Sequence, residues 1–226
     1  MEPKIKELID LANKILEKET SYSDYKKIIF NYFNNTPITM NTKPEDRLLI
    51  IKTRLILIDS TYSTNIRRNR FALDDLANAI YEFKTDEELK KQSRDLIKYL
   101  DKKNPVITNL FDLECGKEIR HLPSLTSKYL HFLNKYQFPI YDSLVKKQIK
   151  YNGNEVLRFL DLIIKKNKQL EINNFEDLDK LLWVKGKIES EKYDGLKTRE
   201  ELNSKDCPKE IKEFKDILKK IDKQKR

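Results

Sequence analysis

The sequence predicts an all-α protein, and three observations support that fold class. The chain of 226 residues contains only four glycines, too few for a fold with many tight turns between strands. Lys, Glu, Leu and Ile are abundant and recur at helical spacing. Apolar residues make up 38% of the chain and charged residues 37%, a composition that suits a helical core under a heavily charged surface.

Prolines and capping residues divide the first part of the chain into helices. Pro3 stands at the first position of one helix, and Ser21 or Ser23 can cap a second helix that ends in residues 34–37. Pro44 opens the most apolar helix, which ends at Tyr62. Apolar residues lie nearly all the way round this helix, so we expect it to run through the centre of the core.

Similar signals place the later helices. Thr85 to Glu88 form an N-terminal capping signature for a helix that runs to about Asp101. Gly186 is placed to close a helix over residues 175–185. Further helices are expected over about 68–83, 107–113, 144–152, 154–166 and 208–220.

Charge and cysteine content limit the class of protein. The formal net charge of +9 is consistent with a polyanionic partner, although lysine-rich chains are often basic without binding nucleic acid. The longest apolar runs are too short to span a bilayer, and the N-terminus has no apolar signal segment. Cys115 and Cys207 form neither a metal motif nor a disulfide framework. We therefore expect a cytoplasmic protein without metal, cofactor or membrane contact.

The segment from His121 to Asp142, HLPSLTSKYLHFLNKYQFPIYD, carries the clearest chemical signal. It places an amine, Lys128, and a carboxylate, Asp142, near the starts of two neighbouring helices. Read by themselves, such residues are ordinarily a solvated lysine and a helix N-cap. The alternative is a nucleophile and an acid–base group, because a neutral lysine amine attacks electrophilic carbon. Burial among Leu125, Tyr129 and Phe132 could favour that neutral form.

Three short motifs in this chain resemble the helix-hairpin-helix DNA glycosylase superfamily, which includes the endonuclease III-like, adenine and 8-oxoguanine glycosylases. HLPSLTSK is similar to the family hairpin and puts Lys128 on the catalytic lysine of its bifunctional members. FPIYDSLVKKQI resembles the segment that delivers the catalytic aspartate, which is matched by Asp142. YSTNI looks like the turn whose asparagine enters the DNA stack, matched by Asn65. Ser124 and Thr126 stand where the family hairpin has glycines, so we expect weaker phosphate binding there.

The resemblance implies a two-lobed helical bundle with a helix-hairpin-helix motif and an interlobe cleft. One lobe would span about 44–140, and the other would combine 1–43 with 141–226. The implied activity is that of a DNA N-glycosylase with an associated AP lyase activity on double-stranded DNA containing a modified base. Lys128 would attack C1′ of a flipped nucleotide, and Asp142 would stabilise the oxocarbenium-like sugar. The protein would act as a monomer, associated with the nucleoid if the source is prokaryotic.

Further residues are expected to hold the DNA or the flipped base. The expected DNA contacts, beside Asn65, are Arg67, Arg68, Arg70, Ser124, Thr126 and Ser127. The expected base-pocket residues are Tyr62, His131, Tyr141 and Trp183, although aromatic side chains more often form core and His131 is more often structural.

Two other functions fit the same sequence. One is a catalytically silent DNA-binding relative, and the other is a helical protein-interaction module whose lysines only solubilise it. Salt dependence distinguishes these, because a DNA binder loses affinity steeply as salt rises. The sequence does not identify the base, which could be a damaged purine, a deaminated or mismatched base, or a modified base of foreign DNA.

Overall fold

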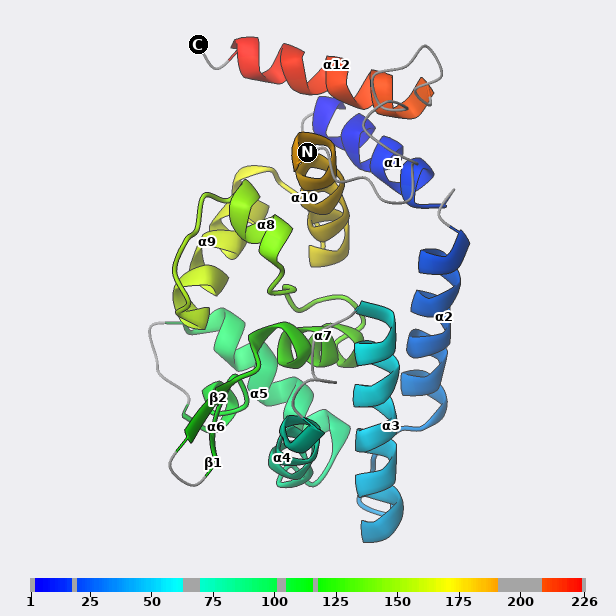
Figure 1. Cartoon of the computed structure of the whole chain (residues 1–226), viewed down its shortest axis with the longest axis vertical. Helices are drawn as coiled ribbons and strands as arrows, with labels where there is room; N and C mark the ends of the chain where they lie inside the picture. The colour runs from blue at the N-terminus through cyan, green and yellow to red at the C-terminus, as the bar shows by residue number, and fades with distance from the viewer. Residues whose placement is uncertain are drawn as a thin grey trace. The chain divides into compact units, whose positions relative to one another are not determined.

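A computed structural model describes residues 3–17, 20–62, 70–100, 105–115, 118–190 and 209–224 (Figure 1). Its helices are α1 (Pro3–Glu17), α2 (Thr20–Asn35), α3 (Pro44–Tyr62), α4 (Arg70–Tyr81), α5 (Asp86–Lys98), α6 (Pro105–Thr108), α7 (Pro123–Leu133), α8 (Ser143–Gln148), α9 (Val156–Gln169), α10 (Phe175–Ser190) and α12 (Lys209–Gln224). Two short antiparallel strands, β1 (Asp112–Cys115) and β2 (Glu118–His121), complete the regular structure of the described residues. The predicted all-α class is confirmed.

The chain divides into two compact units. Unit 1 comprises residues 1–24, 142–153 and 165–226, and unit 2 comprises residues 25–141 and 154–164. In unit 1, α1 packs against α10 and α12, while α8 packs against α10. The apolar faces of these helices form its core, with Leu8, Ala12, Phe214 and Leu178 each almost fully buried.

In unit 2, α7 occupies the central position and packs against α3 and α5 (Figure 1). Each side chain from Leu125 to Leu133 is buried, although the helix includes Thr, Ser, Lys and His. Around it, α3 packs on α4, α4 on β1, and α5 on α6. The most deeply enclosed helix of unit 2 is therefore α7 rather than α3.

The expectation that residues 44–62 run through the centre of the core is wrong. One face of α3, with Ile51, Leu55 and Ile58, is buried, whereas Leu49 and Ile56 on another face are exposed. A helix that is apolar all round has no preferred inner side by composition alone. Its neighbours decide which face is covered, and in unit 2 they cover only one.

Two local expectations are also wrong. Residues 107–113 do not form one helix, because α6 ends at Thr108 and β1 begins at Asp112. The β1–β2 pair returns the chain to Leu122, whose N–H donates to Phe111 O over 2.8 Å. A short apolar run is ambiguous between helix and strand until such a partner is known.

The second correction concerns Gly186, which does not end a helix but lies inside α10. A Cβ at this position would lie 3.2 Å from Leu144 Cβ, tighter than ordinary contact. The glycine therefore allows α8 and α10 to approach closely, a role that its sequence neighbours do not reveal.

Several sequence signals are confirmed. The first helix begins at Pro3 and buries the predicted apolar face. Thr85 caps α5, with its hydroxyl accepting from Glu88 N–H over 3.1 Å. Among the described residues, no helix combines the length and the apolar character needed to cross a membrane.

Candidate active site

Lys128 lies in the second turn of α7 and is buried, with 4% of its surface exposed. Its Nζ donates a hydrogen bond to Ser124 Oγ over 2.7 Å, one helical turn earlier. The same Nζ lies 5.3 Å from the centroid of the Tyr62 ring at the end of α3. Lysine is among the residue types that are least often buried, so its enclosure here needs an explanation. Of the two alternatives for this amine, a solvated and an enclosed lysine, the structure shows the enclosed one.

The hydroxyl groups beside Lys128 are engaged inside unit 2. Thr126 Oγ1 donates to Leu110 O over 2.8 Å. Ser127 Oγ donates to Ser124 O over 3.1 Å and accepts from Tyr141 N–H over 2.9 Å. Thr126 and Ser127 are both buried. These bonds fix the first turns of α7 to its neighbours. Ser124 is less buried than Thr126 and Ser127.

A β-strand precedes the Leu122-Pro123 turn. A helix-hairpin-helix motif has a helix at this place, whereas here β2 ends at His121. His121 Nδ1 lies 2.6 Å from Asp112 Oδ1 on the paired strand, and both side chains are exposed. Leu122 is the N-cap of α7 but offers no side-chain cap, so Pro123 at the first position starts the helix.

Asp142 is the N-cap of α8 in unit 1. Its Oδ1 accepts hydrogen bonds from Leu144 N–H at 2.7 Å and from Val145 N–H at 3.4 Å. Its backbone is extended, as N-cap residues usually are (φ −127°, ψ 146°). The carboxylate therefore has a structural role at the helix start.

One hydrogen bond connects the two ends of the stretch between Lys128 and Asp142. The N–H of Tyr141, the residue before Asp142, is held by the hydroxyl of Ser127, the residue before Lys128. Both partners belong to unit 2. The bond spans fourteen positions of the sequence and holds Tyr141 to the first turns of α7 within unit 2.

Of the four residues expected in a base pocket, Tyr62 and His131 both pack on Phe132 in unit 2, and the His131 and Phe132 ring centroids lie 5.7 Å apart. Tyr62 packs its ring on Phe132, with centroids 6.1 Å apart. His131 is fully buried, and its Nδ1 lies 2.6 Å from Phe138 O, so this nitrogen carries the proton.

Tyr141 and Trp183, the other two expected base-pocket residues, have different ring contacts. The buried ring of Tyr141 packs on Phe159, with centroids 4.7 Å apart. Trp183 belongs to α10 of unit 1, where Lys187 Nζ lies 4.9 Å from its ring centroid. Among the four, the ring centroid of Tyr62 lies 5.3 Å from Lys128 Nζ.

The predicted DNA contacts before α4 fall largely outside the described residues. Asn65, Arg67 and Arg68 belong to residues 63–69 between α3 and α4, which the structure does not describe. Arg70 is the first residue of α4, but its side chain also lies outside the described part. These four assignments remain predictions from the sequence.

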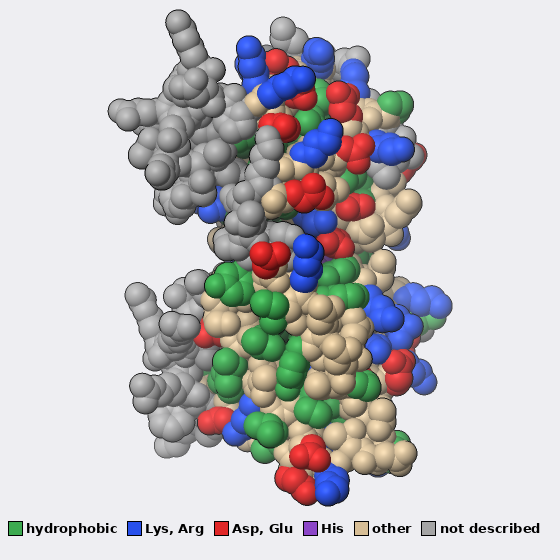
Figure 2. Space-filling model, turned by 90° about the vertical axis from the view of Figure 1, so that its right-hand side faces the viewer, with side chains coloured by type: hydrophobic (Ala, Val, Ile, Leu, Met, Phe, Trp, Pro, Cys, Tyr) green, Lys and Arg blue, Asp and Glu red, His purple; other side chains and the backbone are tan. Residues whose placement is uncertain are grey.

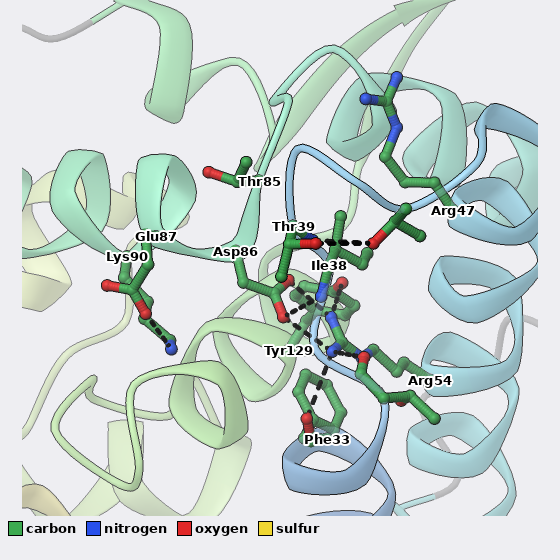
Figure 3. A network of polar contacts seen from close by, with 12 residues as sticks. Phe33, Ile38, Thr39, Arg47, Arg54, Thr85, Asp86, Glu87, Lys90 and Tyr129 are labelled. Atoms are coloured by element: carbon green, nitrogen blue, oxygen red, sulfur yellow. Dashed lines mark hydrogen bonds and ion pairs between the residues drawn. The ribbon is translucent and has the colours of Figure 1, made fainter.

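A buried polar network that the sequence pattern did not predict includes Tyr129, the residue that follows Lys128 on α7 (Figure 3). Arg54 on α3 donates from Nη1 to Asp86 Oδ1 at 2.8 Å and from Nη2 to Asp86 Oδ2 at 2.9 Å. Arg54 Nη1 also donates to the phenol oxygen of Tyr129 at 3.2 Å. The network joins α3, α5 and α7, so it fixes the helix that carries Lys128.

Backbone groups complete this network. Arg54 Nη2 donates to Thr36 O at 2.6 Å, and the N–H of Ile38 donates to Asp86 Oδ2 at 3.0 Å. Thereby the loop between α2 and α3 is tied to the start of α5 (Figure 3). The signal was present in the sequence, because Arg54 shares its helix face with Ile51, Leu55 and Ile58, and a core-facing charge needs a partner.

Burial and charge shape the titration of the network. Burial by itself lowers the pKa of Arg54, but its interactions with Tyr129 and with the Asp86 carboxylate outweigh this and raise that pKa above its ordinary value. Burial raises the pKa of the Tyr129 phenol to about 12, against an opposing effect of the Arg54 charge. The guanidinium thus stays charged and the phenol neutral at physiological pH.

The chain matches a protein-family model over most of its first 137 residues. The model described as HI_0787_N, N-terminal domain, matches residues 4–137, which is more than half of the chain. The chain belongs to this family. The matched range includes α1 to α7 and Lys128, and it ends before Asp142. No curated protein and no solved structure matches the chain significantly.

Proposed function

We propose that this member of the HI_0787_N family is a DNA N-glycosylase with AP lyase activity and that Lys128 is its nucleophile. One observation carries the proposal: the lysine predicted from the hairpin resemblance is buried on α7 and held by Ser124. A buried lysine in a matched position is a candidate for chemistry, because burial of an ionisable group is costly and is retained at functional sites. The net charge of +9 is compatible with a DNA partner.

In the proposed reaction, the Lys128 nitrogen forms a bond to C1′ as the glycosidic bond breaks. The base leaves with the bonding electron pair and takes up a proton, and opening of the sugar ring gives a Schiff base on Lys128. Loss of a C2′ proton then expels the 3′ phosphate, and hydrolysis of the imine returns the free amine. The target nucleotide must first leave the stack, which costs a few kcal/mol.

Asp142 enters the proposal only through the sequence resemblance. Its hydrogen bonds to Leu144 and Val145 account for one carboxylate oxygen. In the proposal the carboxylate would also stabilise positive charge on the sugar or assist proton transfer. The cap bonds favour a second candidate function, that of a DNA-binding relative without base excision, because a helix cap alone explains an aspartate at this position.

Borohydride trapping separates these functions. Sodium borohydride reduces a Schiff base to a stable amine, so duplex DNA with an abasic site should become covalently attached to the wild-type protein. We expect Lys128→Gln to abolish the adduct. A matched control is Lys26→Gln, because Lys26 is also buried and its Nζ lies 4.7 Å from the Tyr136 ring centroid.

The outcomes are distinct once circular dichroism shows that both variants are folded. Loss of trapping in Lys128→Gln with retention in Lys26→Gln supports the proposal. Equal trapping by Lys128→Gln and wild type rejects this nucleophile. Salt-dependent DNA binding without any adduct favours the silent relative, and absence of DNA binding favours the protein-interaction module.

A further inference from the structure

The amine of Lys128 has surroundings that differ from those of the exposed lysines of this chain. Figure 2 shows Lys and Arg side chains at the surface of the molecule, where water solvates their charged groups. Lys128 is instead buried, and its Nζ donates to the hydroxyl of Ser124 over 2.7 Å. The ring centroid of Tyr62 lies 5.3 Å from the same nitrogen. A hydroxyl and an aromatic ring therefore line the place where the amine ends.

The direction of the Lys128 side chain brings the amine to the less enclosed end of α7. Side chains of an α-helix tilt toward its N-terminus, so a lysine reaches the level of the residue one turn earlier. That residue is Ser124, in the first turn, where residues 122–124 are partly exposed. From Leu125 to Leu133 every side chain is buried. The lysine stem is thus enclosed, while its amine ends beside the part-exposed turn of the helix.

The Ser124 hydroxyl can orient the amine in the form that reacts. A lysine amine keeps N–H groups in its charged and in its neutral form, so either form can donate to Ser124 Oγ. With one N–H bound to this oxygen, rotation about the Cε–Nζ bond is restricted. The lone pair of the neutral amine then points away from Ser124. A nucleophile must present this lone pair to the electrophilic carbon, so the hydrogen bond fixes the direction of attack.

The backbone of Ser124 is itself held in place. The hydroxyl of Ser127 donates to Ser124 O over 3.1 Å and accepts from Tyr141 N–H over 2.9 Å. Pro123, at the first position of α7, restricts the backbone just before Ser124. The hydroxyl therefore stands on a fixed helical turn, as a group that positions a reactive side chain needs to do.

We infer that Ser124 is a positioning residue for the Lys128 nucleophile, with its hydroxyl holding the amine in the orientation that attacks C1′ of the nucleotide. This inference rests on the proposed function and deepens it. It gives Ser124 a different role from the phosphate contact expected from the sequence, because the hydroxyl accepts an N–H of the lysine. A reacting group misplaced by about 1 Å can lose about 100-fold in rate, so loss of this bond should slow the covalent step.

Single-turnover borohydride trapping on duplex DNA with an abasic site separates orientation from binding. Ser124→Ala should lower the trapping rate at saturating DNA at least about 10-fold and change the apparent dissociation constant for DNA by less than about twofold. Ser124→Thr keeps a hydroxyl and should restore the rate to within about threefold of wild type. The matched control is Ser60→Ala on α3, because Ser60 Oγ donates to Leu57 O over 2.9 Å at an exposed position. It should trap like the wild type.

The outcomes are read on variants that circular dichroism shows to be folded, as expected for small changes at part-exposed or exposed positions. A Ser124→Ala rate equal to that of wild type overturns the inference but leaves Lys128 as the nucleophile. A loss seen only as weaker DNA binding with a flatter salt dependence also overturns it, in favour of the phosphate contact. Trapping by Ser124→Thr that is as slow as by Ser124→Ala shows that the hydroxyl is not the positioning group. A wild type that forms no adduct rejects the proposed function and this inference together.

Discussion

Helices α3 and α7 of unit 2 differ in how far their side chains are enclosed. Apolar residues lie nearly all the way round α3, yet Leu49 and Ile56 are exposed. The sequence of α7, PSLTSKYLHFL, is mixed, yet every side chain from Leu125 to Leu133 is buried. The polar groups of α7 can be buried because Thr126 and His131 bond to backbone carbonyls and Ser127 bonds to a backbone N–H.

This difference shows that hydrogen-bond partners, as well as hydrophobicity, decide which helix is enclosed. A buried polar group without a partner costs about 1–3 kcal/mol, whereas a bonded one contributes modestly. In unit 2, α7 carries the candidate nucleophile and is enclosed, whereas α3 keeps Leu49 and Ile56 exposed. If that distinction is correct, substitutions of polar groups on α7 and its supports should be more damaging than equivalent changes on the exposed side of α3.

The largest effect is expected for the charge pair that supports α7. Arg54→Met removes the partner of the buried Asp86 carboxylate and should lower the free energy of unfolding by about 3–5 kcal/mol. Urea denaturation measures this change. The double variant Arg54→Met, Asp86→Leu should lose less than the single variant, because no charge is then left unpaired. A single variant that is as stable as wild type would show that the network does not fix α7.

A comparison of two threonines sharpens the contrast between the helices. Thr126 on α7 and Thr53 on α3 both donate to a backbone carbonyl, at 2.8 Å and 2.9 Å respectively. Thr126→Val leaves the buried Leu110 carbonyl without this donor and should cost about 1–3 kcal/mol. Thr53→Val removes a solvent-accessible bond within its own helix and should change stability by less than about 0.5 kcal/mol. Equal effects in urea denaturation would remove the proposed distinction.

A smaller loss of stability than for Arg54→Met is expected at Asp142. Asp142→Ala removes the α8 cap and should cost about 1 kcal/mol, whereas Asp142→Asn keeps an N-cap oxygen and should cost less. If the carboxylate takes part in base excision, Asp142→Asn should still slow excision by about 100-fold or more under single-turnover conditions. An Asn variant with unchanged excision would restrict Asp142 to its structural role.

The sequence predicted local features better than distant contacts. The start of α1 at Pro3 and the Thr85 cap follow from neighbouring residues, and both are confirmed. The Arg54–Asp86 pair depends on residues 32 positions apart, and the Ser127–Tyr141 bond on residues 14 positions apart. The β1–β2 pair and the packing of Gly186 on Leu144 likewise require partners that periodicity does not specify. Asn65, Arg67 and Arg68 stay sequence predictions.

The central claim is that Lys128 forms the covalent bond to DNA, and peptide mapping of the borohydride-trapped complex tests it most directly. After digestion with nuclease and protease, tandem mass spectrometry locates the residue that carries the sugar remnant. The account predicts a single modified position, Lys128, within the α7 segment PSLTSKYLHFL. A remnant on Lys26, or one spread over exposed lysines at the surface, would contradict it.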